Sequence, residues 1–152
     1  MFNTAKFAIA TAIGYPSAAN EAQMVLHHGG KFALDKLLAV CTPGSWLEAQ
    51  RVTESVFIAP PVVAYAVELC RASRSTPGVR LGASPRAAIW LIRSAQAHAV
   101  LSGRNFVAPG DVKAVAVGCL AHRLITDDGD DSIEATVRIV HGLLEATPTP
   151  RP

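Results

Sequence analysis

Four prolines constrain the fold of this chain more than any other feature. Pro43, Pro60, Pro85 and Pro109 follow threonine, alanine, serine and alanine. Proline suits the first position of a helix because its ring fixes φ and its missing N–H is not needed there. The residue before proline is biased away from helical backbone. We therefore predict helices that start at these four prolines, the first three ending near residues 55, 73 and 102.

Further helices are expected over residues 17–28, 32–40 and 132–146, separated by Gly29-Gly30 and other turn residues. In the helix from Pro85, small residues (Ala88, Ala95 and Ala99) share a face with Ile92. A small face lets a partner helix approach closely. In the helix from Pro109, we predict Val112, Ala116, Leu120 and Leu124 facing inward, with Lys113 and Arg123 facing outward. The sequence thus predicts an all-α bundle of about six helices, with a loop over residues 75–82.

Composition narrows the class of protein. Half of the 152 residues are hydrophobic and 17% are charged, so the chain is long and apolar enough for one core. A net charge of +2 gives no support to a strongly basic nucleic-acid binder. Three separated cysteines favour free buried thiols in a reducing compartment, which points to the cytoplasm. The apolar runs are too short to span a membrane.

Residues 7–13, FAIATAI, predict a strand that is apolar on both faces. Such a strand belongs inside a sheet, yet no second convincing strand is present to pair with it. Without a sheet, we expect this stretch to be disordered, to pack back as a helix, or to pair with another copy of the chain.

Arg86 lies in the first turn of a predicted helix, after Ser84 as N-cap and Pro85 as first residue. A cation there is slightly unfavourable unless an anion joins it, because the helix dipole already attracts negative charge. One interpretation is a surface arginine whose stem covers apolar groups. The other is a phosphate site made by Arg86 and the free N–H groups of the first turn, to which Arg80 could add.

The stretch GRNFVAPGDVKAV, residues 103–115, has a helix–short strand–helix pattern. It fits a packing motif in which Asp111 is favoured by the helix dipole. The same pattern occurs in histone folds, so a stand-alone helical interaction module or DNA binder is the alternative function.

Other motifs carry little chemistry. The five histidines and three cysteines lack the spacing of a metal site, and residues 127–131, DDGDD, are interpreted as an acidic turn. The sequence G-x-x-x-x-G-K-[ST] of a P-loop is absent from the 152 residues.

Residues 79–124 closely resemble the C-terminal lid of the MoxR family of AAA+ ATPases. The matching pieces are GASPRA, GRNFVAPGDVKA and LAHRL, and IGYPSAANEAQMV, residues 13–25, is similar to the family's junction between core and lid. The resemblance implies that residues 1–15 are a remnant of the core's last strand and the hinge, that residues 16–146 are the lid, and that residues 147–152 are a disordered tail.

The resemblance also implies roles for individual residues. Gly14, Tyr15 and Pro16 would form the hinge beside the adenine. Arg86 would be the sensor 2 arginine, which reaches the γ-phosphate of ATP. The implied function is to cover ATP, bound with magnesium in the complete ATPase, and to sense its γ-phosphate within a chaperone-like ring.

Departures from the family limit what this chain is expected to do alone. The P-loop, Walker B carboxylates and sensor 1 are absent, and Ala5-Lys6-Phe7 stands where members carry Asp-Arg-Phe. We expect no ATP hydrolysis and no tight nucleotide binding by the isolated chain. The expected partners are an AAA+ core or neighbouring ring subunits, with a homo-oligomer through the unpaired strand as a further option. The client protein, and whether the chain is a split-gene half, a truncation or a degenerate paralogue, stay open.

Overall fold

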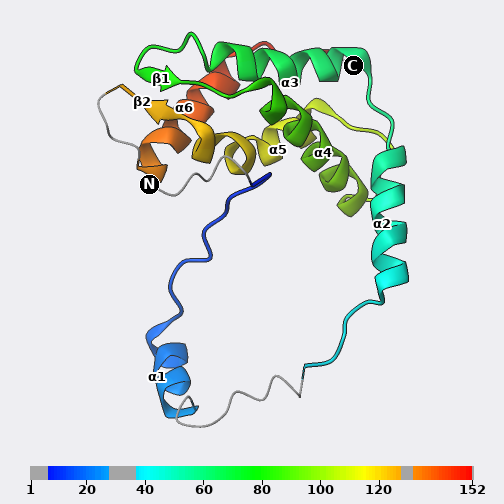
Figure 1. Ribbon diagram of the computed structural model, residues 1–152, viewed down its shortest axis with the longest axis vertical. Helices are drawn as coiled ribbons and strands as arrows, with labels where there is room; N and C mark the ends of the chain where they lie inside the picture. Colours follow the sequence, from blue (N-terminus) through cyan, green and yellow to red (C-terminus); the bar gives the residue numbers. More distant parts are fainter. Residues whose placement is uncertain (1–6, 28–36, 128–131, 152) are drawn as a thin grey trace.

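The computed structural model describes residues 7–27, 37–127 and 132–151. Within these residues the protein is mainly helical, with one two-stranded sheet (Figure 1). The elements in chain order are α1 (Ala18–His27), α2 (Pro43–Ser55), α3 (Pro60–Ala72), β1 (Val79–Leu81), α4 (Pro85–Leu101), α5 (Pro109–Leu120), the 3₁₀ helix η3 (Ala121–Arg123), β2 (Ile125–Thr126) and α6 (Ile133–Ala146). The predicted all-α bundle of about six helices is confirmed.

All four prolines begin helices, as predicted: α2, α3, α4 and α5 each start at one of them. Two other local signals act as expected. Thr42 caps α2, accepting a hydrogen bond from the Ser45 amide at 3.1 Å, and the Ser45 hydroxyl accepts one in return from the Thr42 amide at 2.9 Å. Ser132 accepts a hydrogen bond from the amide of Ala135 at the start of α6.

The core lies between α3, α4, α5 and α6, with α4 and α5 side by side (Figure 1). Ala95 and Ala99 of α4 are fully buried, as the small-residue face predicted, and Leu91 joins them. On α5 and just beyond it, the four positions predicted to face inward are all buried: Val112, Ala116, Leu120 and Leu124. Small alanines on α4 therefore allow the close approach of α5.

The sequence predicted no sheet: β1 lies inside the loop predicted over residues 75–82, and β2 follows η3, where no strand was predicted. β1 pairs antiparallel with β2, with Val79 opposite Thr126 and Leu81 opposite Ile125. The prediction missed it because two strands of three and two residues, more than 40 residues apart in sequence, are too short to show an alternating pattern. A second contact joins Phe57 and Phe106: the Phe57 amide donates to the Asn105 carbonyl at 3.0 Å, and the Val107 amide donates to the Phe57 carbonyl at 2.9 Å.

The strand predicted over residues 7–13 is not formed. This stretch contains neither helix nor strand, and Figure 1 shows it running as an irregular trace from the bundle toward α1. A strand requires a hydrogen-bonded neighbour along its length, and none of the described segments supplies one. The stretch does not pack back as a helix either.

Three smaller predictions need correction or lie outside the described residues. Arg123 is buried rather than outward, and Cys41 is exposed, whereas Cys70 and Cys119 are buried free thiols as expected. The helix expected over 32–40 falls mostly outside the described residues, and 37–40 form no helix. Residues 128–131 of the acidic turn also lie outside them. No helix in the described part of the chain has the length and apolarity needed to cross a bilayer.

Candidate functional site

Arg86 occupies the second position of α4 and is exposed. Ser84 holds the N-cap position predicted for it, with φ −74° and ψ 164°, but its side chain makes no capping hydrogen bond. No carboxylate of the described residues forms an ion pair with Arg86. The first turn of α4 therefore presents a guanidinium together with backbone N–H groups that no side chain caps.

The segment before α4 is fastened to the end of α3, which sets the position of Arg86. The Ala83 amide donates to the Ser73 hydroxyl at 2.9 Å, and the Arg74 Nε donates to the Ala83 carbonyl at 2.7 Å. A Cβ added to Gly82 would lie 2.7 Å from backbone atoms of Ser73 and Arg74. Only glycine permits this approach without a backbone shift. The N-terminus of α4 is thus rigidly placed on the bundle.

Arg123 brings a second cation to the same end of the bundle. Its side chain is 8% exposed, and its Nε donates to the Cys119 carbonyl at 2.8 Å. Burial lowers the pKa of Arg123, and the positive charge of Arg86 lowers it further. Arg86 lies at the start of α4, and Arg123 follows the end of α5, which packs against α4.

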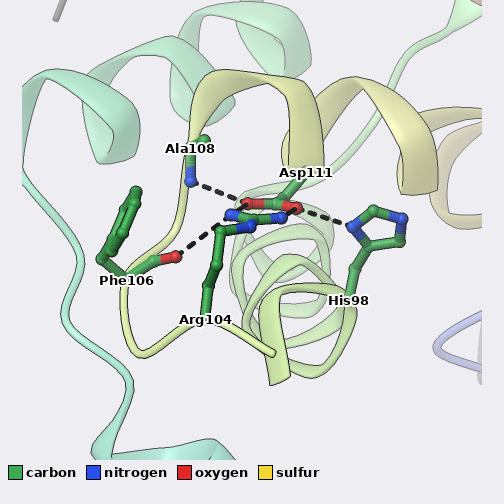
Figure 2. Close-up of polar contacts among 5 residues, drawn as sticks. All are labelled: His98, Arg104, Phe106, Ala108 and Asp111. Carbon is green, nitrogen blue, oxygen red and sulfur yellow. Dashed lines mark hydrogen bonds and ion pairs between the residues drawn. The ribbon is translucent and has the colours of Figure 1, made fainter. Parts of the chain in front are cut away.

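At the opposite end of α4, polar groups converge on Asp111, as Figure 2 shows. Arg104 donates to both carboxylate oxygens, with Nη1 2.7 Å from Oδ2 and Nη2 2.5 Å from Oδ1. His98 Nδ1 lies 2.6 Å from Oδ1, and the Ala108 amide donates to Oδ2 at 2.7 Å. Asp111 thereby joins the last turns of α4, the connecting loop and the first turn of α5.

The Asp111 cluster has a structural role. Its carboxylate is 1% exposed, and the paired Arg104 holds its pKa well below the usual range although burial opposes this. The same loop carries Asn105 and Val107, which bond Phe57, so the cluster also fixes the contact between the α4–α5 loop and the α2–α3 link. The sequence placed Asp111 in the first turn of a helix, but it gave no sign that Arg104 and His98 would meet there.

The short extended stretch between the two helices of residues 103–115 forms its backbone pairing within the chain. It pairs with Phe57 and not with a partner protein. The geometry therefore fits the packing interpretation better than the histone-fold one.

The remaining predicted site residues are not brought to Arg86 by any described contact. Gly14, Tyr15 and Pro16 are all exposed, and Gly14 has a φ of +75°. Arg80 is exposed in β1. Among the described residues no group of three or more His, Cys, Asp and Glu side chains could hold a metal ion.

Comparison with known proteins gives a consistent result. Residues 71–141 match the family model of the AAA lid domain. The chain is 31% identical over 120 residues to the uncharacterized protein YeaC of Bacillus subtilis and 29% identical over 129 residues to the chaperone MoxR1 of Mycobacterium tuberculosis. These matches cover 79% of this chain, but only 38% and 34% of the two relatives. It is also 30% identical to the MoxR protein of Methylorubrum extorquens, over 67% of this chain and 34% of that protein.

A solved structure agrees with the sequence matches. The crystal structure of a "putative ATPase" from Cytophaga hutchinsonii is similar with a TM-score of 0.79 and 25% identity, over 97% of this chain and 48% of that one. The chain thus spans between a third and two fifths of the curated relatives and about half of the solved structure.

Proposed function

Because this chain carries the lid domain of a MoxR-type AAA+ ATPase, we propose that it covers ATP and senses the γ-phosphate through Arg86. One observation carries the proposal: Arg86 stands at the N-terminus of α4 beside N–H groups that the Ser84 side chain does not cap. A helix N-terminus with an added guanidinium suits a phosphate oxygen. The neighbouring cation of Arg123 adds to the positive potential at this end.

The residues of this chain suit the terminal phosphate of a nucleotide, but they do not form a complete nucleotide-binding site. In the proposal, Arg86 contacts the γ-phosphate and stabilises negative charge as the phosphoryl group leaves. Gly14, Tyr15 and Pro16 form the hinge near the base. The P-loop and the magnesium ligands come from an AAA+ core, because the 152 residues contain no P-loop motif. Alone, the chain is proposed to bind nucleotide weakly and not to hydrolyse it.

We also propose a cellular setting for this chain. The partners proposed are an AAA+ core and neighbouring ring subunits, working in the cytoplasm on the maturation of other proteins. The name of the Mycobacterium relative, chaperone MoxR1, supports this. The alternative function is a stand-alone helical interaction module, and the test below distinguishes it from a lid.

The test is a titration of the labelled chain with ATP and with ADP, followed by ¹⁵N NMR. ATP is expected to shift the amides of Ala87 and Ala88 in the first turn of α4, ADP to shift them less, and Arg86→Ala to abolish the difference. Arg93→Ala is the matched control, because Arg93 is an exposed arginine farther along the same helix, stacked on Trp90.

Three outcomes would overturn the proposal. The first is an equal response to ATP and ADP that survives Arg86→Ala. The second is ATP turnover by the chain alone that survives this substitution. The third is tight DNA binding that weakens steeply with salt, which would favour the interaction module instead.

A further inference from the structure

Residues 7–10, here called the strap, lie against the end of α5 and η3. The carbonyl of Phe7 accepts hydrogen bonds from the Arg123 guanidinium and from His122 Nε2, the latter at 3.1 Å. At the other end of the strap, the Ala10 amide donates to the Gly118 carbonyl at 2.9 Å. The strap is therefore held at both ends by groups of one surface.

The receiving surface consists of Gly118, His122 and Arg123. The Gly118 carbonyl belongs to the last turn of α5, where carbonyls lack partners within the helix. Arg123 bridges two backbones, because its Nε donates to the Cys119 carbonyl while its terminal nitrogen donates to Phe7. Burial lowers the pKa of His122, and its neutral ring can donate from Nε2 to the strap carbonyl.

The absence of a side chain at Gly118 also leaves space for the strap. A Cβ placed there would lie 3.1 Å from the Ile9 Cγ2 and 3.4 Å from the Ala10 carbonyl oxygen. Glycine is among the least favourable residues for a helix interior, and at Gly118 the absent side chain leaves space that Ile9 and Ala10 occupy. Gly142 in α6 provides the contrast, because an added Cβ there meets nothing within 4 Å.

We propose that Gly118, His122 and Arg123 form an intramolecular clamp for the strap, with Arg123 as the positioning residue. The clamp fixes where the linker of residues 11–16 leaves the bundle, at the same end as Arg86. The clamp itself requires no nucleotide, so it can hold whether or not Arg86 senses phosphate.

The test is amide hydrogen exchange of Ala10 in the full 152-residue chain, measured by NMR without nucleotide. In the wild type we expect the Ala10 amide to exchange at least about tenfold more slowly than in an unstructured peptide. Gly118→Val places a branched side chain against Ile9, and we expect it to remove this protection while the amides of Leu91 and Val112 keep theirs. Gly142→Val, the matched helical glycine, is expected to leave Ala10 protected.

A second pair of variants leaves the bundle untouched. Ala10→Pro removes the strap donor, and we expect it to lower the heteronuclear NOE of the Ile9 amide, whereas Ala12→Pro in the exposed linker leaves it unchanged. Unprotected Ala10 in the wild type, or an Ile9 amide equally ordered in Ala10→Pro and Ala12→Pro, would overturn the clamp. Neither result depends on ATP, so the clamp and the role of Arg86 fail or stand separately.

Discussion

Helices α2 and α4 begin alike and end up in opposite environments. Both start at a proline after a hydroxyl residue, and α2 has the better local start, because Thr42 and Ser45 form a reciprocal capping box whereas Ser84 caps nothing with its side chain. Yet α4 buries six residues and α2 buries none. In Figure 1, α2 runs down the side of the molecule and α1 lies well away from the bundle.

The contrast shows that helix formation and helix packing are separate pieces of information in this sequence. Capping and proline placement define where a helix starts, and each contributes on the order of 1 kcal/mol. Most helical stability comes from burying an apolar face, which α4 has and α2 lacks within the described residues. The exposed Trp46, Leu47 and Val52 of α2 are therefore apolar groups whose contribution to the stability of this chain is small.

The largest expected difference is between leucine-to-alanine substitutions in the two helices. Leu91→Ala empties a fully buried position in α4 and should lower the free energy of unfolding by about 3 kcal/mol. Leu47→Ala removes a side chain that is 53% exposed in α2, and its expected cost is about 0.5 kcal/mol. Urea unfolding of both variants measures the difference. Equal losses would mean that α2 is packed as tightly as α4.

A smaller effect is expected at the Asp111 cluster, which links the bundle to the α2–α3 connection. Asp111→Asn keeps the shape but removes the charge that Arg104 and the Ala108 amide bind, and should cost about 2 kcal/mol. Glu48→Gln is the matched control on α2, because Glu48 makes only an exposed contact with Arg51. A loss at Glu48 as large as the loss at Asp111 would contradict the structural role of the cluster.

The same cluster predicts a pH dependence with a definite sign. The pKa of Asp111 is lower in the folded protein than in the unfolded chain, where it is about 3.9. The unfolded chain therefore binds the proton first, and the stabilisation from Asp111 is present above about pH 4 and is lost as the pH falls below it. Urea midpoints at several acidic pH values should fall less steeply for Asp111→Asn than for the wild type.

The starts of the helices and the inward faces of the bundle could be predicted from local sequence, but the orientation of Arg123 could not. Extending the helical period of α5 through residue 123 places Arg123 outward. In the structure α5 ends at Leu120 and the 3₁₀ helix η3 follows, with three residues per turn, which turns Arg123 inward. The sequence signal for this change is weak, because the boundary between Leu120 and Ala121 carries no proline or glycine and the nearest glycine, Gly118, lies inside the last turn of α5.

The candidate site also has one part that could be predicted from local sequence and another that could not. The location of Arg86 follows from Ser84 and Pro85, which are adjacent to it in sequence. The Asp111 cluster and the strap could not be predicted, because their partners are brought together by tertiary contacts: His98 is 13 residues from Asp111, and Phe7 is 115 residues from His122. The expected strand at residues 7–13 failed for a related reason, since a strand exists only with a neighbour.

Hydrogen exchange across the whole chain tests most directly the claim that α4 is held by packing in the core, whereas α2, which contacts α4 but buries none of its own residues, is held mainly by its caps. We expect interior amides of α4 to exchange only through global unfolding and amides of α2 beyond its first turn to exchange at least about a hundredfold faster. Protection in α2 equal to that in α4 would contradict the account, because it would show that α2 unfolds together with the bundle.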